Sequence, residues 1–310
     1  MFWRLQALLC KAEVTYGLDP VPSGAANAIL AENVKISPMK GQDVKRNYER
    51  PFFAADGTIP AGLHATISFE VELKGSGTAG TAPACDPLLL ACKMAKVTVG
   101  GVSVTYNPHS GVQGSCTIHF NNDGILYVMK GCRGTWKYTL TAQGIVRLMF
   151  EMTGLFTQPS TAALPTPVYG TQLTQLPQVA TTVNTPVFTI GGTAMILKQA
   201  TFDAGCMVKP RFWVGSESII IDGAEENFDC TVETVPLATF NPYTLAAAAT
   251  PTPIVLTHGT GAGKVVTLTQ PGAQVMRSEG LGETDGITEY SVKATPLPVV
   301  SNDQYTLAFT

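Results

Sequence analysis

The chain has little charge, and the charge it has is balanced between the two signs. Only 14% of its 310 residues are Asp, Glu, Lys or Arg, against roughly a quarter in an average soluble domain. The formal net charge of −3 is not the footprint of a surface that grips nucleic acid phosphates. Low charge together with 45% hydrophobic residues favours an assembly subunit over a free enzyme.

Segments that would direct the chain into a membrane are also missing from the pattern. The apolar run at the N-terminus is short for a secretion signal, and Arg4 and Gln6 interrupt it. Leu9, before Cys10, is too large for a lipoprotein cleavage site. No run approaches the roughly 20 apolar residues of a membrane helix, so we expect no membrane insertion.

The seven cysteines do not indicate a disulfide framework. They form no CxxC pair and their number is odd. Single cysteines inside β-patterned segments usually behave as small buried apolar side chains. We therefore expect free thiols and a reducing compartment.

No motif meets the requirements of catalysis or cofactor binding. The stretch from His258 to Lys264 resembles a phosphate-binding loop, but His258 stands where the first Gly belongs and Val265 where the hydroxyl residue belongs. The four histidines lack metal-ligand spacing, and Glu70 and Glu72 have no partner for acid–base catalysis. We expect a β-turn after His258, no enzymatic activity, and no cofactor or metal.

What the sequence does have is β-strand patterning, which is clearest from Leu63 to Leu73. Apolar side chains occupy the odd positions of this stretch and polar side chains the even positions. A period of two predicts a strand with one buried and one solvated face. Further strands are expected at residues 33–37, 97–106, 115–121, 125–130, 133–141, 145–153, 187–190, 194–203, 254–257, 264–269 and 287–294.

Two helices and two irregular segments complete the pattern. Asp86-Pro87 and Asn241-Pro242 each place a capping residue before a proline at the first helical position, which predicts a short helix in each half, the first over 87–94. Residues 1–33 are interpreted as an extended arm. Residues 41–55 mix charges with aromatic rings, which is typical of a protein interface, although a solvated hairpin tip has the same composition. The interface candidates are Asp43, Lys45, Arg46, Tyr48, Glu49, Arg50, Phe52 and Phe53.

The order of these parts recurs in the second half. Residues 220–233 can be laid on residues 59–72 without a gap, which places Phe228 on Ile67 and Glu233 on Glu72. A charged and aromatic segment, an alternating strand, a capped helix and further strands follow one another in both halves. We interpret this order as an internal duplication. The predicted first domain spans residues 1–157, a Pro/Thr-rich linker 158–185, and the second domain 186–310.

Six blocks, kept in order, resemble a known family. They are Tyr16–Leu30, Ser68–Pro83, Pro87–Cys92, Phe150–Phe156, Val214–Ser218 and Leu256–Thr260. Together they are similar to the tail tube (major tail) proteins of long-tailed, siphovirus-type bacteriophages. The resemblance implies a mostly β protein with two tandem tail-tube-like β-sandwich or barrel domains, each with one short flanking α-helix.

The same resemblance implies a structural virion protein that polymerises into stacked rings. The rings would form the tail tube, the channel through which DNA is delivered to the host, and would assemble in the host bacterial cytoplasm. The implied partners are the chain itself, the tape measure protein, the tail terminator and baseplate proteins, with double-stranded DNA as transient lumen cargo. The duplication favours three chains in a pseudo-hexameric ring, with a ring of six chains as the alternative.

A tube lumen has to pass DNA without holding it, which disfavours many Lys or Arg contacts to phosphate. Glu70, Glu72 and Glu233 are the candidates for its lining; the alternative is that their strand face meets solvent outside. Residues 1–33 and 41–55 are expected to touch the adjacent ring. Two other functions remain open, namely another virion ring protein such as a tail terminator or baseplate ring, and a carbohydrate-binding β-module.

Overall fold

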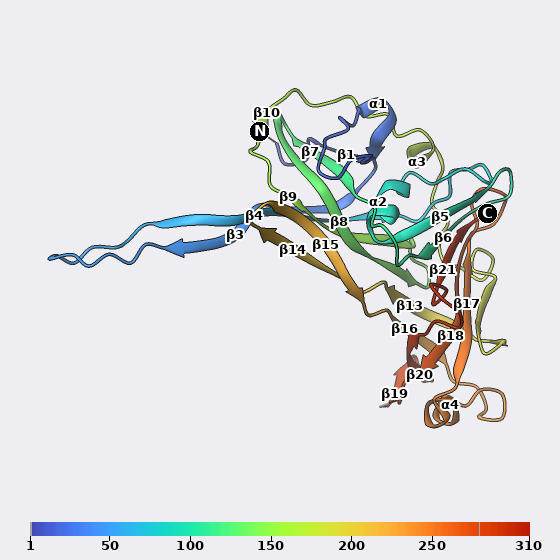
Figure 1. The fold of residues 1–310 in the computed structure, drawn as a ribbon. Coiled ribbons are helices and arrows are strands. Elements are labelled where there is room, and N and C mark those ends of the chain that lie inside the picture. The colour runs from blue at the N-terminus through green and yellow to red at the C-terminus, as the bar shows by residue number, and fades with distance from the viewer. Residues whose placement is uncertain (1, 279) are drawn as a thin grey trace.

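The computed structural model describes residues 2–278 and 280–310 and consists mainly of strands (Figure 1). Strands hold 52% of the residues and helices 7%, which confirms the expected mostly-β fold. Among the described residues, the helices are all too short and polar to cross a bilayer.

The elements follow one another in two series joined by a connecting stretch. The first series is β1 (Gln6–Ala12), α1 (Gly24–Asn27), β2 (Ala28–Ile29), β3 (Glu32–Lys45), β4 (Thr58–Glu72), α2 (Asp86–Ala91), β5 (Met94–Val99), β6 (Ser103–Pro108), β7 (Cys116–Asn122), β8 (Ile125–Thr141) and β9 (Arg147–Leu155). The connecting stretch holds β10 (Ser160–Thr161) and α3 (Thr171–Thr174). The second series is β11 (Val187–Ile190), β12 (Thr193–Ala194), β13 (Leu197–Asp203), β14 (Cys206–Trp213), β15 (Ser216–Ala224), β16 (Asn227–Glu233), α4 (Pro242–Ala248), β17 (Pro251–His258), β18 (Val266–Val275), β19 (Leu281–Thr284), β20 (Ile287–Pro296) and β21 (Thr306–Phe309).

Most of the strands form two long antiparallel rows. Of the others, β1, β2, β7 and β10 join the first row through β8, and β14 and β15 form a separate hairpin. One row runs β3–β4–β9–β8–β13–β16–β20–β19. The other runs β12–β11–β17–β18–β21–β6–β5. Strands from both halves of the chain take part in each row, through the β8–β13 pair in the first and the β21–β6 pair in the second.

The chain has one hydrophobic core cluster, which contains residues from both halves. Trp136 of β8 has its ring 5.2 Å from that of Phe202 of β13 and 5.9 Å from that of Tyr305. All three side chains are buried. The halves of the chain therefore do not fold around separate cores.

Strand β4 bears out the alternation that was read from the sequence. Its side chains from Ala65 to Val71 alternate between buried and half-buried, and Phe69 is only 1% exposed. Phe69 packs against Phe150 of β9 with 5.8 Å between ring centroids. The corresponding strand β16 buries Phe228 and Val232 in the same alternation.

Both predicted helices are present and cover the core. In α4, the Asn241 side chain accepts a hydrogen bond of 3.0 Å from the Thr244 backbone N–H and so caps the helix. In α2, Asp86 is instead the first helical residue, and its carboxylate accepts a 2.6 Å hydrogen bond from the Tyr106 hydroxyl. This helix ends earlier than predicted, because Lys93 adopts a positive φ of 62° and β5 begins at the next residue.

The strand pairings of the first series recur in the second. The pairs β1–β2, β1–β7, β7–β8, β3–β4 and β4–β9 have as counterparts β11–β12, β11–β17, β17–β18, β13–β16 and β16–β20. Strand β8, which pairs with β9, has its counterpart in β18 and β19 together, which both pair with β20. The boundaries proposed for two domains remain predictions.

Four expectations about single elements were wrong. Residues 194–203 are not one strand, because β12 ends at Ala194 and β13 begins at Leu197. Residues 1–33 are not an extended arm, because β1 pairs with β7 and buries Leu8 and Leu9. Residues 97–106 are not one strand but a hairpin, β5–β6, with a turn at Gly101. Residues 125–141 form one strand instead of two. A bulge at Gly131 (φ 58°) interrupts its pairing with β9 but not the strand itself, and a Cβ there would lie 2.7 Å from the Tyr16 ring.

The outer part of the β3–β4 hairpin leaves the body of the molecule and projects far from it (Figure 1). Strand β3 continues to Lys45 and β4 starts at Thr58, so the segment 41–55 lies at the end of this hairpin. We call residues 38–62 the arm. Both descriptions offered by the sequence, an interface segment and a hairpin tip, are compatible with this position.

The shared core leads to a prediction about unfolding. Replacing Phe202 with Ala should destabilise the unassembled chain by about 3–5 kcal/mol, since it removes a fully buried aromatic ring. Urea unfolding should show one transition for the whole chain, shifted to lower urea. Val214→Ala, at a fully exposed side chain, should change the free energy of unfolding by no more than about 0.5 kcal/mol. Two separate transitions, of which only the second responds to Phe202→Ala, would contradict a shared core.

Candidate functional site: the polar sheet face and the arm

The outward face of the first row of strands carries polar side chains in register across both halves. One line of directly opposed residues crosses six strands, from β4 to β20. Its members, in order, are Glu72, Arg147, Thr139, Thr201, Asp229 and Lys293. Because directly opposed residues point to the same side of a sheet, these side chains share one face. We call it the polar face.

The three glutamates singled out in the sequence all lie on the polar face. Glu70 and Glu72 are on β4, and Glu233 is on β16, four residues beyond Asp229 and therefore on the same side of its strand. Their counterparts on the other side of these strands, Phe69 and Val232, are buried in the core. The structure thus places the glutamates together on one surface, and which environment that surface faces remains a prediction.

Basic side chains neutralise most of these acids locally. The Arg147 Nε atom lies 3.0 Å from Glu32 and 3.6 Å from Glu70, and the Lys74 Nζ atom lies 2.5 Å from Glu72. Opposite Glu233 stands Glu289, which binds Lys198 at 3.0 Å. The polar face is therefore a mixed surface on which most of these acids are paired with basic side chains.

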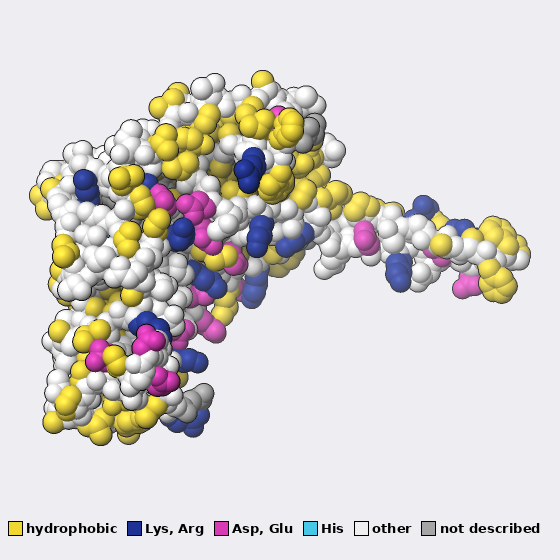
Figure 2. Space-filling view, turned by 180° about the vertical axis from the view of Figure 1, so that it is seen from behind, with side chains coloured by type: hydrophobic (Ala, Val, Ile, Leu, Met, Phe, Trp, Pro, Cys, Tyr) yellow, Lys and Arg dark blue, Asp and Glu magenta, His cyan; other side chains and the backbone are white. Residues whose placement is uncertain are grey.

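The same pairing occurs where the two halves meet. Lys137 of β8 and Asp203 of β13 are directly opposed, with Nζ and Oδ2 3.0 Å apart. The hydrogen bond that Lys137 donates to Asp203 raises the pKa of Lys137, so its ammonium form is favoured at neutral pH. Figure 2 shows charged side chains of both signs gathered along the hollowed side of the molecule, beneath the arm.

The arm ends in an aromatic cluster that is exposed to solvent. Arg46 lies over the Tyr48 ring at 4.8 Å, and Arg50 contacts the rings of Tyr48 and Phe52 at 5.3 and 5.9 Å. Phe52 is 63% exposed and Phe53 is fully exposed. The apolar side chains at the arm tip are visible in Figure 2. An exposed cluster of this kind is typical of a surface that another protein covers.

The predicted interface residues share one hairpin with two of the three lining candidates, Glu70 and Glu72. Asp43 and Lys45 lie on β3, the residues from Arg46 to Phe53 lie in the loop that follows, and β4 returns from this loop into the body. Glu70 and Glu72 stand at the far end of β4. One hairpin therefore links the exposed tip to the polar face.

The second hairpin, β14–β15, is held against the body by side chains that the sequence analysis missed. The Ile219 N–H donates to the Tyr16 hydroxyl at 2.6 Å, and the Ile221 N–H donates to Gln113 Oε1 at 3.0 Å. Arg133 donates to the Ile219 carbonyl, and the Gln113 amide donates to the Ile221 carbonyl. These side chains satisfy the backbone of β15 much as a neighbouring strand would.

We call Tyr16, Gln113 and Arg133 the clamp; their side chains are half-buried. Arg133 stacks over the Tyr16 ring at 4.7 Å. Burial raises the pKa of the Tyr16 hydroxyl and lowers the pKa of the Arg133 guanidinium, yet at neutral pH both groups keep the protonated form that the clamp uses. Periodicity could not have revealed these residues, because their target is more than 80 residues away in the chain.

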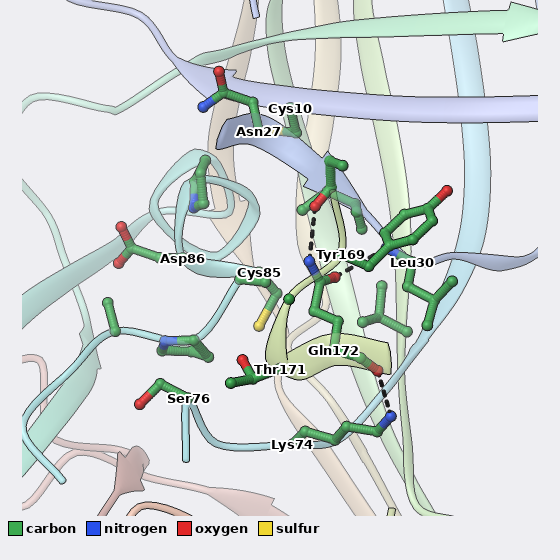
Figure 3. Close-up of a pocket in the computed structure, with 18 of the residues that line it drawn as sticks. Cys10, Asn27, Leu30, Lys74, Ser76, Cys85, Asp86, Tyr169, Thr171 and Gln172 are labelled. Carbon is green, nitrogen blue, oxygen red and sulfur yellow. Dashed lines mark hydrogen bonds between the residues drawn. The ribbon is translucent and has the colours of Figure 1, made fainter. Parts of the chain in front are cut away.

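A cavity of about 500 Å³ lies between α1, α2 and α3 (Figure 3). Gln172 of α3 closes it, since its side chain accepts from the Leu30 N–H at 2.9 Å and donates to the Ala28 carbonyl at 2.8 Å. The Lys74 ammonium donates to the Gln172 carbonyl at 2.7 Å. These bonds fasten the connecting stretch to β2. The polar groups of Lys74 and Gln172 are thus bonded within the chain, and we interpret the cavity as structural.

The remaining motifs have structural roles. His258 ends β17 as a buried residue whose ring nitrogens lie 3.0 Å from the Thr185 hydroxyl and 3.1 Å from the Gln178 carbonyl. Residues 261–264 form a turn after His258, as predicted. His119 is 9% exposed, and its Nε2 atom lies 2.8 Å from Asp19 Oδ2. The described residues contain no cluster of His, Cys, Asp or Glu suited to a metal ion, and the seven cysteines are free thiols.

Comparison with known proteins identifies a family for this chain. A search of curated proteins gives no match. A family model described as phage tail tube protein matches residues 3–305, which is nearly the whole chain. The chain belongs to the phage tail tube protein family.

Proposed function

We propose that this chain polymerises into stacked rings that form a phage tail tube, through which DNA is delivered to the host. The observation that carries the proposal is the β8–β13 pair, which joins the two halves of the chain into one sheet. Strand β13 corresponds to β3 in the repeated pairing order, so the chain already contains one joint between like units. Repeating that joint between chains would generate a ring.

The ring would contain three chains. Each chain carries two copies of the pairing order, so three chains supply six similar units, and a ring of six chains is the alternative. The two edge strands of the first row, β3 and β19, are the ends left for further joints. Unpaired sheet edges are a hazard in a monomer, and their use between subunits removes that hazard.

The polar face would line the lumen. Its charges are of both signs and mostly paired, so the phosphates of passing DNA would meet few free cations. A tight grip needs many Lys or Arg contacts to phosphate. The arm would contact the adjacent ring, because its aromatic tip is exposed in the single chain. The body supplies the ring and the arm the axial contact.

The proposal includes a siphovirus-type virion as location, assembly in the host bacterial cytoplasm, and no enzymatic activity. Tape measure, tail terminator and baseplate proteins would be its partners, with DNA as transient cargo. A tail terminator or baseplate ring would share the ring but not its repetition along an axis. A carbohydrate-binding β-module would need neither.

Electron microscopy of the purified protein, with the mass of an isolated ring, tests the proposal. We expect long tubes of stacked rings and three chains in each ring. Six chains in a ring would contradict the trimer alone. Single rings that never stack would favour a terminator or baseplate ring, and binding to glycans without any ring would favour the carbohydrate-binding module.

Deleting residues 41–55 should leave a folded, soluble chain that no longer forms long tubes, because these residues have no part in the core. A milder variant, Phe52→Ser with Phe53→Ser, should shorten the tubes seen by electron microscopy. The matched control is Val112→Ser with Val300→Ser, at side chains that are 92% and 85% exposed elsewhere. Normal tubes from the deletion would refute the role of the arm.

Replacing Glu70, Glu72 and Glu233 together with Lys should slow DNA ejection from virions, because it adds cations where phosphates would pass. Raising the salt concentration should restore the rate, since salt screens such contacts. The triple Gln variant is the control: it removes the same three carboxylates without adding a cation, and should eject normally. An unchanged ejection rate in the Lys variant at low salt would argue against this lining.

A further inference from the structure

We propose that the ring closes by antiparallel pairing of β3 of one subunit, at residues 32–37, with β19 of the next, at residues 281–284. The inference rests on the proposed function and deepens it. It names the partner, a second copy of this chain, and the register in which the two copies meet. The template for that register lies inside the chain, in the β8–β13 pair.

Both strands have one edge without a partner strand. Within residues 2–278 and 280–310, β3 pairs with β4 alone and β19 pairs with β20 alone. They lie at opposite ends of the same row and do not pair with each other within one chain. A partner strand for either edge would therefore come from another subunit. An unpaired edge offers a line of backbone donors and acceptors to an incoming strand.

The pairing order gives the counterpart of β3 residue by residue. Ile36 is opposite Ile67 on β4, and Phe202 is opposite Phe228 on β16. Since Ile67 and Phe228 occupy the same place in the aligned segments, Ile36 corresponds to Phe202. By the same steps through Glu70 and Thr231, Glu32 corresponds to Gln199. Strand β3 has one residue more between these points, which its bulge between Glu32 and Lys35 absorbs.

The counterpart of the end of β8 follows in the same way. Arg147 is opposite Glu72, and Glu289 is opposite Glu233, so Arg147 corresponds to Glu289. Thr139 is opposite Arg147, and Gly282 is opposite Glu289. Strand β19 therefore corresponds to the last residues of β8. In particular, Leu281 corresponds to Tyr138, and Thr284 to Thr141.

The internal pair then predicts the contact between chains. Phe202 is opposite Tyr138, and Gln199 is opposite Thr141. Transferred to the ring, Ile36 of one subunit is opposite Leu281 of the partner subunit. Likewise, Glu32 is opposite Thr284 of the partner subunit. The joint between chains would thus pair the free backbone edges of β3 and β19, as β8 and β13 are paired within the chain.

Exposure of the side chains agrees with this register. Phe202 and Tyr138 are only 0% and 1% exposed, because they lie opposite each other where the two halves of the chain meet. Leu281, in the place of Tyr138, is 61% exposed in the single chain. Ile36 is half-buried and packs at the margin of the core. Ring closure would bring these two apolar side chains together and extend the core across the joint.

A pair of cysteines tests the register. Ile36→Cys and Leu281→Cys in one chain, assembled into tubes and treated with the short thiol-bridging reagent dibromobimane, should give covalent dimers and trimers on a denaturing gel. Each single variant should remain monomeric. In the shifted control, Ser37→Cys with Leu281→Cys, the two side chains point to opposite faces, so bridging should fall at least about tenfold, given that a one-residue slip inverts the face.

The outcomes separate this joint from the function on which it rests. Efficient bridging of the 36–281 pair and weak bridging of the shifted pair support the register. Equal or stronger bridging of the shifted pair overturns it. If tubes form but neither pair is bridged, this joint is overturned and the tube function stands. If the unmodified chain forms no tubes, the proposed function falls, and the joint falls with it.

A charge at the joint provides a second measurement. Leu281→Asp should leave the thermal midpoint of the unassembled chain unchanged, because the side chain is exposed there. It should raise the protein concentration needed for tubes by about tenfold or more, since a charge would be buried without a partner. Val300→Asp, at a side chain that is 85% exposed, is the control and should assemble normally. Normal assembly of Leu281→Asp would overturn the joint.

Discussion

The pairing of β13 with β8 is the contact on which the rest of this structure depends. It turns two series of strands into one row, gives them a common polar face, and brings Trp136 and Phe202 into one core. Without it each half would expose an edge strand and the margin of its core. The Lys137–Asp203 ion pair stands on its polar side and the buried aromatic rings on the other, so burial and charge both favour the same register.

The polar face has to be hydrated and yet present few free cations. A surface in water needs charged or polar side chains, but a surface along which a polyanion slides cannot present many free cations. Arg147 lies between Glu32 and Glu70, and Lys198 beside Glu289, so the surface stays hydrated while these two cations are paired with acids. The sequence analysis found the acids because strand alternation exposes them. It could not find their partners, which come from strands far along the chain.

Local rules predicted the elements whose character is local. Alternation identified β4, and a capping residue followed by proline identified α2 and α4. Elements set by distant contacts were missed. Strand β1 is a short apolar run whose strand character depends on pairing with β7, and the β14–β15 clamp depends on Tyr16, Gln113 and Arg133, which no spacing connects to Ile219. The polar face could be predicted in part, and the arm was predicted as a segment but not as a projection.

The β3–β4 hairpin and the β14–β15 hairpin occupy equivalent places in the repeated order, but only the first projects from the body. Side chains from the first half fasten β14–β15 to the body, while the arm remains free. A ring of three such chains would carry six similar units around its circumference but only three arms. Its mating surface would then have three-fold symmetry, so the next ring could be seated in three equivalent rotational settings, 120° apart, instead of six. The duplicated chain would thus halve the number of ways in which neighbouring rings can be rotated against each other, and so help to define the twist of the tube.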